Sequence, residues 1–195
     1  MAANIRILNS TGILWLVLSA VWLVTIARYA TGGAVYGEFI HATGEWSVRL
    51  MMVAMAATPL RLLFPGRGWT AWLLKHRRHF GVASFAFAVP HLAAYVLRLD
   101  GPRIASEAIE PGMLTGWIAF LIFLALAVTS NDTFVRKLGR QWKLLHRFVY
   151  VAAILTFAHW ILTAYDPAAG IAHLIVLAAL EMFRVWRVRD SKPGQ

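Results

Sequence analysis

Long apolar runs dominate this sequence of 195 residues and limit what it can fold into. A helix of about 20 mostly apolar residues is long enough to cross the hydrocarbon core of a bilayer. In lipid, every backbone polar group must be bonded within the chain, which favours helices. Six runs fit this description, so we predict an all-α integral membrane protein, a bundle of six transmembrane helices. The predicted spans are residues 12–29, 42–60, 80–97, 112–130, 144–165 and 168–185.

Composition supports a single membrane domain over residues 1–195. Only 14% of the residues are charged, against about 25% in soluble domains, and six spans leave no room for a separate soluble domain. The first run is too long for a signal peptide and has no convincing cleavage site, so we expect it to be retained. The chain has no cysteine, which excludes disulfides, thiolate-bound zinc, iron–sulfur clusters and covalently attached haem.

Basic residues gather on alternate connections between the predicted spans. The connections 61–79 and 131–147 and the C-terminal end are rich in Lys and Arg, including Lys192, whereas the other connections are poor in them. By the positive-inside rule, this places both termini in the cytoplasm. The same asymmetry accounts for the net charge of +10, so we expect the lipid bilayer as partner of the basic loops and no nucleic acid.

Three histidines in the apolar runs are the first candidates for function. An imidazole at membrane depth is costly and usually functional, and two on one run opposite a third favour haem ligation. His91 lies about 16 to 18 Å along the third span and His159 about 20 to 22 Å along the fifth, which runs in the same direction. We therefore predict that His91 and His159 meet at one level in the outer half of the membrane, where haem ligation is one interpretation and interior hydrogen bonding without a metal is the other.

A second, inner site is predicted at the cytoplasmic ends of the same two spans. His146 is level there with Arg77 and Arg78. On ideal helices Arg77 and His91 lie within about 40° of one face, but His146 and His159 lie about 140° apart. The fifth span alone therefore does not establish that its two histidines share a face.

Other polar residues have simpler explanations. We expect His76 and His79, in the segment KHRRHF, to be solvated or in contact with lipid headgroups. Arg49 lies four residues after Glu45, which predicts an ion pair within one helix; a clamp on a haem propionate is the alternative. Gly112 and Gly116 form a G-x-x-x-G pair, which indicates close helix packing.

Several segments together resemble a known family. They are RRHFGVASFAFAVPHLAAYVL, LAVTSN, RKLGRQWKLLHRFVY, AHW, ATPLR and HATGEW. These resemble the MsrQ (YedZ) family, the haem-binding membrane subunits of a periplasmic protein-methionine-sulfoxide reductase system, within the ferric-reductase-like transmembrane proteins. The resemblance covers nearly the whole chain.

The resemblance implies a haem b electron-transfer subunit in the bacterial inner membrane. Electrons would come from the quinone pool or a cytosolic flavin reductase and go to a periplasmic molybdopterin subunit, which would itself reduce methionine sulfoxide in oxidised proteins. FMN is also associated with the family. By position, His91 and His159 match the outer haem ligands and His146 the inner histidine. Arg77 stands where oxidase relatives have a second inner histidine, so His76 or His79 could substitute as ligand.

Alternatives of other classes stay open from the sequence. They are a membrane anchor or scaffold for a periplasmic partner, a ferric-reductase-like transmembrane reductase with another acceptor, and a transporter of protons or metal ions. The number of haems, one or two, is also open. The chain has no G-x-G-x-x-G loop, so we do not expect it to oxidise a nicotinamide cofactor directly.

Overall fold

The computed structural model describes residues 10–190 and contains six helices long and apolar enough to cross a membrane. The prediction of a six-helix, multi-pass membrane protein is therefore confirmed. Lys192 lies outside the described residues. The spans are α2 (Thr11–Ala30), α3 (Tyr36–Leu63), α4 (Gly68–Arg98), α6 (Pro111–Val128), the joined pair α8 (Arg140–His146) and α9 (Val149–Thr163), and α10 (Ala168–Asp190). Two short helices, α5 (Gly101–Glu107) and α7 (Asp132–Leu138), lie in connections.

The third span begins much earlier than predicted. Helix α4 starts at Gly68 rather than at residue 80, so Arg77 and Arg78 lie well inside the helix and not at its beginning. The preceding turn contains Gly66 with φ of +79°, a conformation that glycine adopts without strain. Charged side chains mark where a helix leaves the hydrocarbon, but they do not end it. The predicted boundary was therefore wrong.

The fifth span is interrupted, contrary to the single helix predicted. Helix α8 ends at His146 and α9 begins at Val149. Between them the backbone N–H groups of Arg147 and Phe148 donate to carbonyls three residues earlier, at 3.2 and 3.0 Å. Such turns are tighter than an α-helix. The angle calculated for an unbroken helix between His146 and His159 therefore does not apply.

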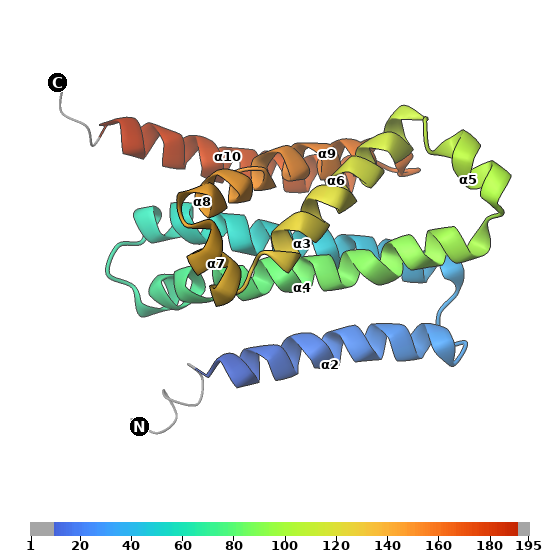
Figure 1. The fold of residues 1–195 in the computed structure, drawn as a ribbon, viewed down its shortest axis with the longest axis horizontal. Coiled ribbons are helices and arrows are strands. Elements are labelled where there is room, and N and C mark those ends of the chain that lie inside the picture. Colours follow the sequence, from blue (N-terminus) through green and yellow to red (C-terminus); the bar gives the residue numbers. More distant parts are fainter. Residues whose placement is uncertain (1–9, 191–195) are drawn as a thin grey trace.

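Helices α3 and α4 form the centre of the bundle (Figure 1), with α2 on one side and α9 and α10 on the other. One buried cluster joins α2 to α3 and α4, and its members are Leu14, Leu50, Ala57, Leu73, Phe80, Ala83 and Phe87. A second joins α3 to α6, α9 and α10, and its members are Val48, Met51, Phe123, Ala152, Ala153, Phe157 and Leu177. The space between α3, α4, α6 and α9 is where the candidate site lies.

A proline explains one of the attachments of α2. Pro90 is buried inside α4, and because proline has no N–H, the carbonyl four residues earlier loses its helical partner. That carbonyl belongs to Ala86, and Trp22 Nε1 of α2 donates to it at 2.8 Å. An unpaired carbonyl is expensive in lipid, so this bond holds α2 against α4 at a fixed height.

Candidate functional site

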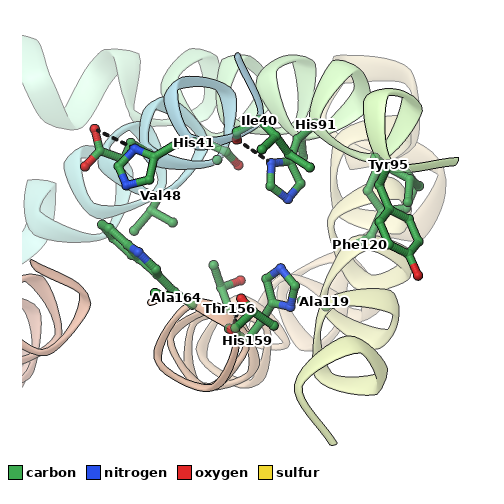
Figure 2. Close-up of a pocket in the computed structure, with 18 of the residues that line it drawn as sticks. Ile40, His41, Val48, His91, Tyr95, Ala119, Phe120, Thr156, His159 and Ala164 are labelled. Carbon is green, nitrogen blue, oxygen red and sulfur yellow. Dashed lines mark hydrogen bonds and ion pairs between the residues drawn. The ribbon is translucent and has the colours of Figure 1, made fainter. Parts of the chain in front are cut away.

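His91 and His159 face each other across a cavity inside the bundle. His91 comes from α4 and His159 from α9, and their ring centres are 6.1 Å apart with the ring planes at 88°. Figure 2 shows both rings pointing into the same space. The predicted meeting of these two residues is confirmed. The separation leaves room for one metal ion at about 2 Å from a nitrogen of each ring.

A backbone carbonyl orients each of the two rings. His91 Nδ1 lies 2.9 Å from the carbonyl oxygen of Ile40, and His159 Nδ1 lies 2.8 Å from that of Gly112. A carbonyl oxygen only accepts, so each Nδ1 carries the hydrogen and donates it. The lone pair of each imidazole is then on Nε2. This is the usual state of a histidine that binds a metal through Nε2.

Two glycines allow the rings to approach the neighbouring helices. A Cβ added at Gly116 would lie 2.7 Å from His159 Nδ1, and one at Gly44 would lie 3.1 Å from His91 Nδ1 and Cε1. A Cβ at Gly112 would meet Thr163 Cγ2 at 3.0 Å. The close packing predicted from Gly112 and Gly116 is confirmed. The role of Gly44 was missed, although its segment HATGEW is one of those that carry the family resemblance.

The outer cavity around the histidine pair has a volume of about 410 Å³ and is lined by α3, α4, α6 and α9. Its lining is mostly apolar, with Val48, Phe120 and Phe123 among its walls. This size is typical of a cofactor site. Among the described residues, no group of three His, Cys, Asp or Glu could hold a metal ion. Two imidazoles in an apolar cavity therefore fit a haem, which brings its own equatorial nitrogens, better than a bare ion.

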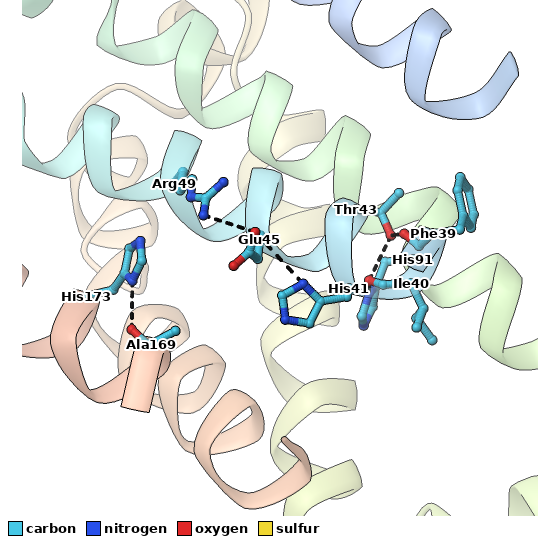
Figure 3. A network of polar contacts seen from close by, with 9 residues as sticks. All are labelled: Phe39, Ile40, His41, Thr43, Glu45, Arg49, His91, Ala169 and His173. Atoms are coloured by element: carbon cyan, nitrogen blue, oxygen red, sulfur yellow. Dashed lines mark hydrogen bonds and ion pairs between the residues drawn. The ribbon is translucent and has the colours of Figure 1, made fainter. Parts of the chain in front are cut away.

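Polar side chains gather at the rim of the outer cavity. Glu45 pairs with Arg49 at 3.0 Å, as predicted, and with His41 at 3.9 Å (Figure 3). On the opposite helix, Tyr95 donates its hydroxyl to Glu107 at 2.9 Å. Glu107 also accepts from Arg103 at 2.8 Å. These bonds attach the short helix α5 to the mouth of the cavity.

An inner cavity of about 300 Å³ lies toward the other end of the bundle. Its lining contains His146, Arg77 and Arg78, so the predicted cluster is present, together with Lys143 and Arg147 of the α8–α9 segment. Arg77 reaches Thr58 Oγ1 at 3.5 Å, and Arg78 pairs with Asp132 of α7 at 2.7 Å. The cavity therefore combines a cationic end with apolar walls, which suits an anionic group on an aromatic molecule.

His146 is held differently from the outer pair. Its Nε2 lies 3.2 Å from Thr129 Oγ1, and its ring stacks on Trp142 with centres 3.9 Å apart. Because the Thr129 hydroxyl already donates to the carbonyl of Ala125 at 2.7 Å, it accepts from His146. The described lining of the inner cavity includes one imidazole, and neither His76 nor His79 belongs to it.

The expectation for His76 was wrong. Its side chain is completely buried, at 0% exposure, and His79 is half-buried beside Trp15 of α2. The two histidines lie on the side of α4 that packs against α2, whereas Arg77 and Arg78 line the inner cavity. A charged segment at the end of a span suggested solvation, but on a helix only some of its residues face outward.

One wall separates the two cavities. Phe123 lines both of them, Ser47 lines the outer one and Ser84 lines the inner one. Ser84 donates its hydroxyl to the carbonyl of Ser47 at 2.8 Å. The two cavities are therefore neighbours, separated by one aromatic ring and one hydrogen-bonded contact between α3 and α4.

The sequence is similar to those of known proteins. Residues 43–157 match the family described as the ferric reductase like transmembrane component. A relative from Xanthomonas axonopodis pv. citri is 35% identical over 168 residues, which cover 84% of this chain and 75% of the relative. One from Brucella ovis is 31% identical over 194 residues, covering 93% and 86%. Both are named protein-methionine-sulfoxide reductase heme-binding subunit MsrQ.

The chain belongs to the MsrQ family. The family match within the ferric-reductase-like proteins includes Gly44, His91, Gly116 and His146 and stops two residues before His159. No solved structure matches the chain. Membership of the MsrQ family was predicted from the sequence segments, and the comparisons confirm it.

Proposed function

We propose that this chain is the haem b electron-transfer subunit of a methionine sulfoxide reductase system in the bacterial inner membrane. It would accept electrons from the quinone pool or a cytosolic flavin reductase. It would pass them to a periplasmic molybdopterin subunit that repairs oxidised proteins. The single observation that carries the proposal is the facing pair His91 and His159, each with Nδ1 donating to a carbonyl and Nε2 free.

The chain's own residues supply position and insulation. A haem supplies the one-electron ferric–ferrous chemistry when bound. His91 and His159 would hold it through their Nε2 atoms, and the carbonyls of Ile40 and Gly112 keep those rings from turning. The apolar lining with Val48 and Phe120 excludes water. The low polarity of this lining would also influence the reduction potential of the haem.

The inner cavity would hold the second redox group of the same chain. The lining of the inner cavity carries positive charge on Arg77, Lys143 and Arg147. This charge would attract the propionates of a haem or the phosphate of FMN, so a second haem or FMN is the expected occupant. His146 is the candidate ligand if the occupant is a haem. Electrons would then cross from the inner to the outer cavity through the wall that contains Phe123.

The test is the haem content of the purified protein and its histidine variants. We expect His91→Ala and His159→Ala each to abolish the low-spin outer haem, because one axial nitrogen is lost, and to remove the corresponding reduced α band. His173→Ala is the matched control, since this histidine lies on α10 with its Nδ1 on the carbonyl of Ala169. Pyridine-haemochrome quantitation gives the number of haems per chain.

Retention of the full bis-histidine spectrum in both outer variants would contradict the assignment. A wild-type protein without any haem absorbance would contradict the function itself. The anchor alternative would then be the better explanation of the fold.

A further inference from the structure

A proline interrupts the hydrogen bonds of α4 directly before the outer histidine. Pro90 is buried inside α4 and immediately precedes His91. Because proline has no N–H, the carbonyl of Ala86 receives no hydrogen bond from the residue four positions later. Membrane helices tolerate such a proline where a neighbouring helix bonds to the freed carbonyl. The turn of α4 that leads to His91 therefore depends on a donor from elsewhere in the bundle.

Helix α2 supplies this donor. Trp22 Nε1 lies 2.8 Å from the Ala86 carbonyl oxygen, and an indole N–H only donates, so the two groups are complementary. At the other end of the same turn, His91 Nδ1 donates to the carbonyl of Ile40 in α3 at 2.9 Å. The turn that carries the outer histidine is therefore attached to two neighbouring helices, by Trp22 where it begins and by Ile40 where it ends.

Much of α2 faces outward. Its apolar side chains Leu16, Val17, Leu23 and Val24 are between 52% and 69% exposed. Apolar packing has no preferred direction, so it allows α2 to slide or turn against α4. A hydrogen bond instead needs a short distance and a nearly linear approach of the donor. The bond from Trp22 can therefore set the height and rotation of the α4 turn more sharply than the apolar contacts of α2 can.

We propose that Trp22 is a positioning residue for His91 and acts through the carbonyl of Ala86. With this bond in place, the His91 ring keeps its angle of 88° to the His159 ring and its distance of 6.1 Å between ring centres. The inference rests on the proposed function, in which these two rings hold one haem. It gives α2 a role in the outer site, although none of the described residues of α2 lines the outer cavity.

The first measurement follows the His91 ring itself. The full chain is labelled with ¹⁵N-histidine, placed in lipid nanodiscs and reduced with dithionite, because low-spin ferrous haem is diamagnetic and permits NMR. Trp22→Phe removes the indole N–H and keeps an aromatic ring. We expect the Nδ1–H resonance of His91 to shift, and to shift more than that of His159, whose carbonyl partner is Gly112 of α6. An unchanged His91 resonance would overturn the proposal.

The second measurement reports the angle between the two rings. In oxidised low-spin haem, the low-field g value in the EPR spectrum is largest when the planes of the two axial imidazoles are nearly perpendicular, as the rings of His91 and His159 are here. We expect Trp22→Phe to lower this g value, because the His91 turn loses one of its two attachments. The same g value in the variant and the wild type would contradict a positioning role.

Pro90→Ala distinguishes the lost hydrogen bond from general damage. This substitution restores an N–H at position 90, so the carbonyl of Ala86 regains a partner within α4. We therefore expect Trp22→Phe to leave the His91 resonance and the g value unchanged when it is added to Pro90→Ala. Equal shifts in both backgrounds would overturn the proposal. If Trp22→Phe alone loses its haem, the double variant should regain it, and a double variant that also lacks haem would count against the proposal.

Trp15→Phe is the matched control. Trp15 also lies on α2 and packs against α4, with its ring centre 5.8 Å from that of His79, but without a hydrogen bond to α4 in the described structure. Its His91 resonance and g value should match the wild type, and shifts as large as those in Trp22→Phe would overturn the proposal. A wild-type protein without haem would remove the proposed function, while the His91 resonance of that chain would still decide whether Trp22 positions this ring.

Discussion

At the scale of single residues, the position of one hydrogen decides what each imidazole can bind. In the outer cavity the carbonyls of Ile40 and Gly112 draw that hydrogen to Nδ1 of His91 and His159. In the inner cavity the Thr129 hydroxyl draws it to Nε2 of His146. The three histidines therefore do not present the same ring nitrogen, without its hydrogen, to their surroundings. Only the outer two present Nε2.

Gly116 provides a residue-scale test of the outer pair. In Gly116→Ala the new Cβ would lie 2.7 Å from His159 Nδ1, so the ring must move away from its carbonyl partner. We expect reduced haem content and destabilisation of about 1 to 3 kcal/mol, as for other overpacked sites. Gly81→Ala is the control, because Gly81 lines the inner cavity and its Cβ would meet nothing within 4 Å. Soret absorbance per chain and thermal unfolding measure both effects, and equal haem content in the two variants would contradict the expectation.

Much of the outer pair was predictable, because depth in a membrane follows directly from the rise per residue of a helix. His91 and His159 could therefore be matched before any packing was known. The burial of His76 was not predictable in the same way, since it depends on where α2 packs and not on the local sequence. Gly44 was missed because one glycine beside a histidine on another helix leaves no periodic signal.

At the scale of elements, the short helix α8 forms part of the wall of the inner cavity, and the short helix α7 is attached next to it. Helix α8 supplies Lys143 and His146 to its lining, and α7 is tied to α4 by the pair of Asp132 and Arg78 at 2.7 Å. Gly139 joins the two helices with φ of +51°, which permits the sharp change of direction. The ion pair therefore attaches α7 to Arg78, a residue of the cationic end of the inner cavity.

The attachment of α7 should depend on pH. The Arg78 guanidinium holds the pKa of the Asp132 carboxyl below its usual value by hydrogen bonding and by its charge. A carboxyl whose pKa is lower in the folded state stabilises that state above its ordinary pKa near 4, and the contribution is lost as the pH falls through the lowered pKa. We expect α7 to loosen only at strongly acidic pH.

A spin label can report this loosening, because the chain has no cysteine and Lys137→Cys therefore labels α7 uniquely. The nitroxide should become more mobile as the pH is lowered through the titration of Asp132. In Asp132→Asn it should be mobile at all pH values, since the charge is absent. A label with the same pH profile in both proteins would show that other contacts hold α7.

The sequence predicted that the six helices exist but not where each one begins and ends. Each span is apolar and long enough to cross a bilayer, so the number of helices could be predicted. The interruption between His146 and Val149 carries no glycine or proline, so no local signal marked it. The start of α4 at Gly68 was missed because the basic residues within its first three turns indicated a connection outside the membrane.

At the scale of the whole molecule, charge is distributed unequally between the two ends of the bundle. The end with α7, α8 and the C-terminal part of α10 carries most of the basic residues, and the end with α5 carries Glu107 and Glu110 (Figure 1). The outer histidine pair lies toward the α5 end, since His159 bonds to Gly112 near the start of α6. With the predicted cytoplasmic termini, the outer cavity is nearer to the periplasm.

The α5 end should be the surface that delivers electrons to a soluble partner. Glu107 is already bonded to Tyr95 and Arg103, so Glu110 is the cleaner charge to change. We expect Glu110→Lys to slow reoxidation of the reduced haem by a molybdopterin partner roughly two- to tenfold at low salt, with less effect at high salt. Stopped-flow traces at two ionic strengths measure it.

The haem spectrum and its reduction by dithionite should stay the same in Glu110→Lys, which makes this variant a test of docking alone. Glu107→Gln is the comparison, because it removes a bond at the mouth of the outer cavity and should alter the spectrum as well. An unchanged reoxidation rate in Glu110→Lys at both ionic strengths would place docking on another surface.

The interruption between α8 and α9 also bears on how the family can change over time. An insertion or deletion of one residue rotates everything beyond it on a continuous helix by about 100°. Here the register of α9 is fixed independently by Ala152, Ala153 and Phe157, which are 0%, 5% and 1% exposed. A length change in α8 would therefore re-aim His146 while leaving His159 in place. Relatives could therefore differ in what the inner cavity holds while His159 keeps its position in the outer cavity.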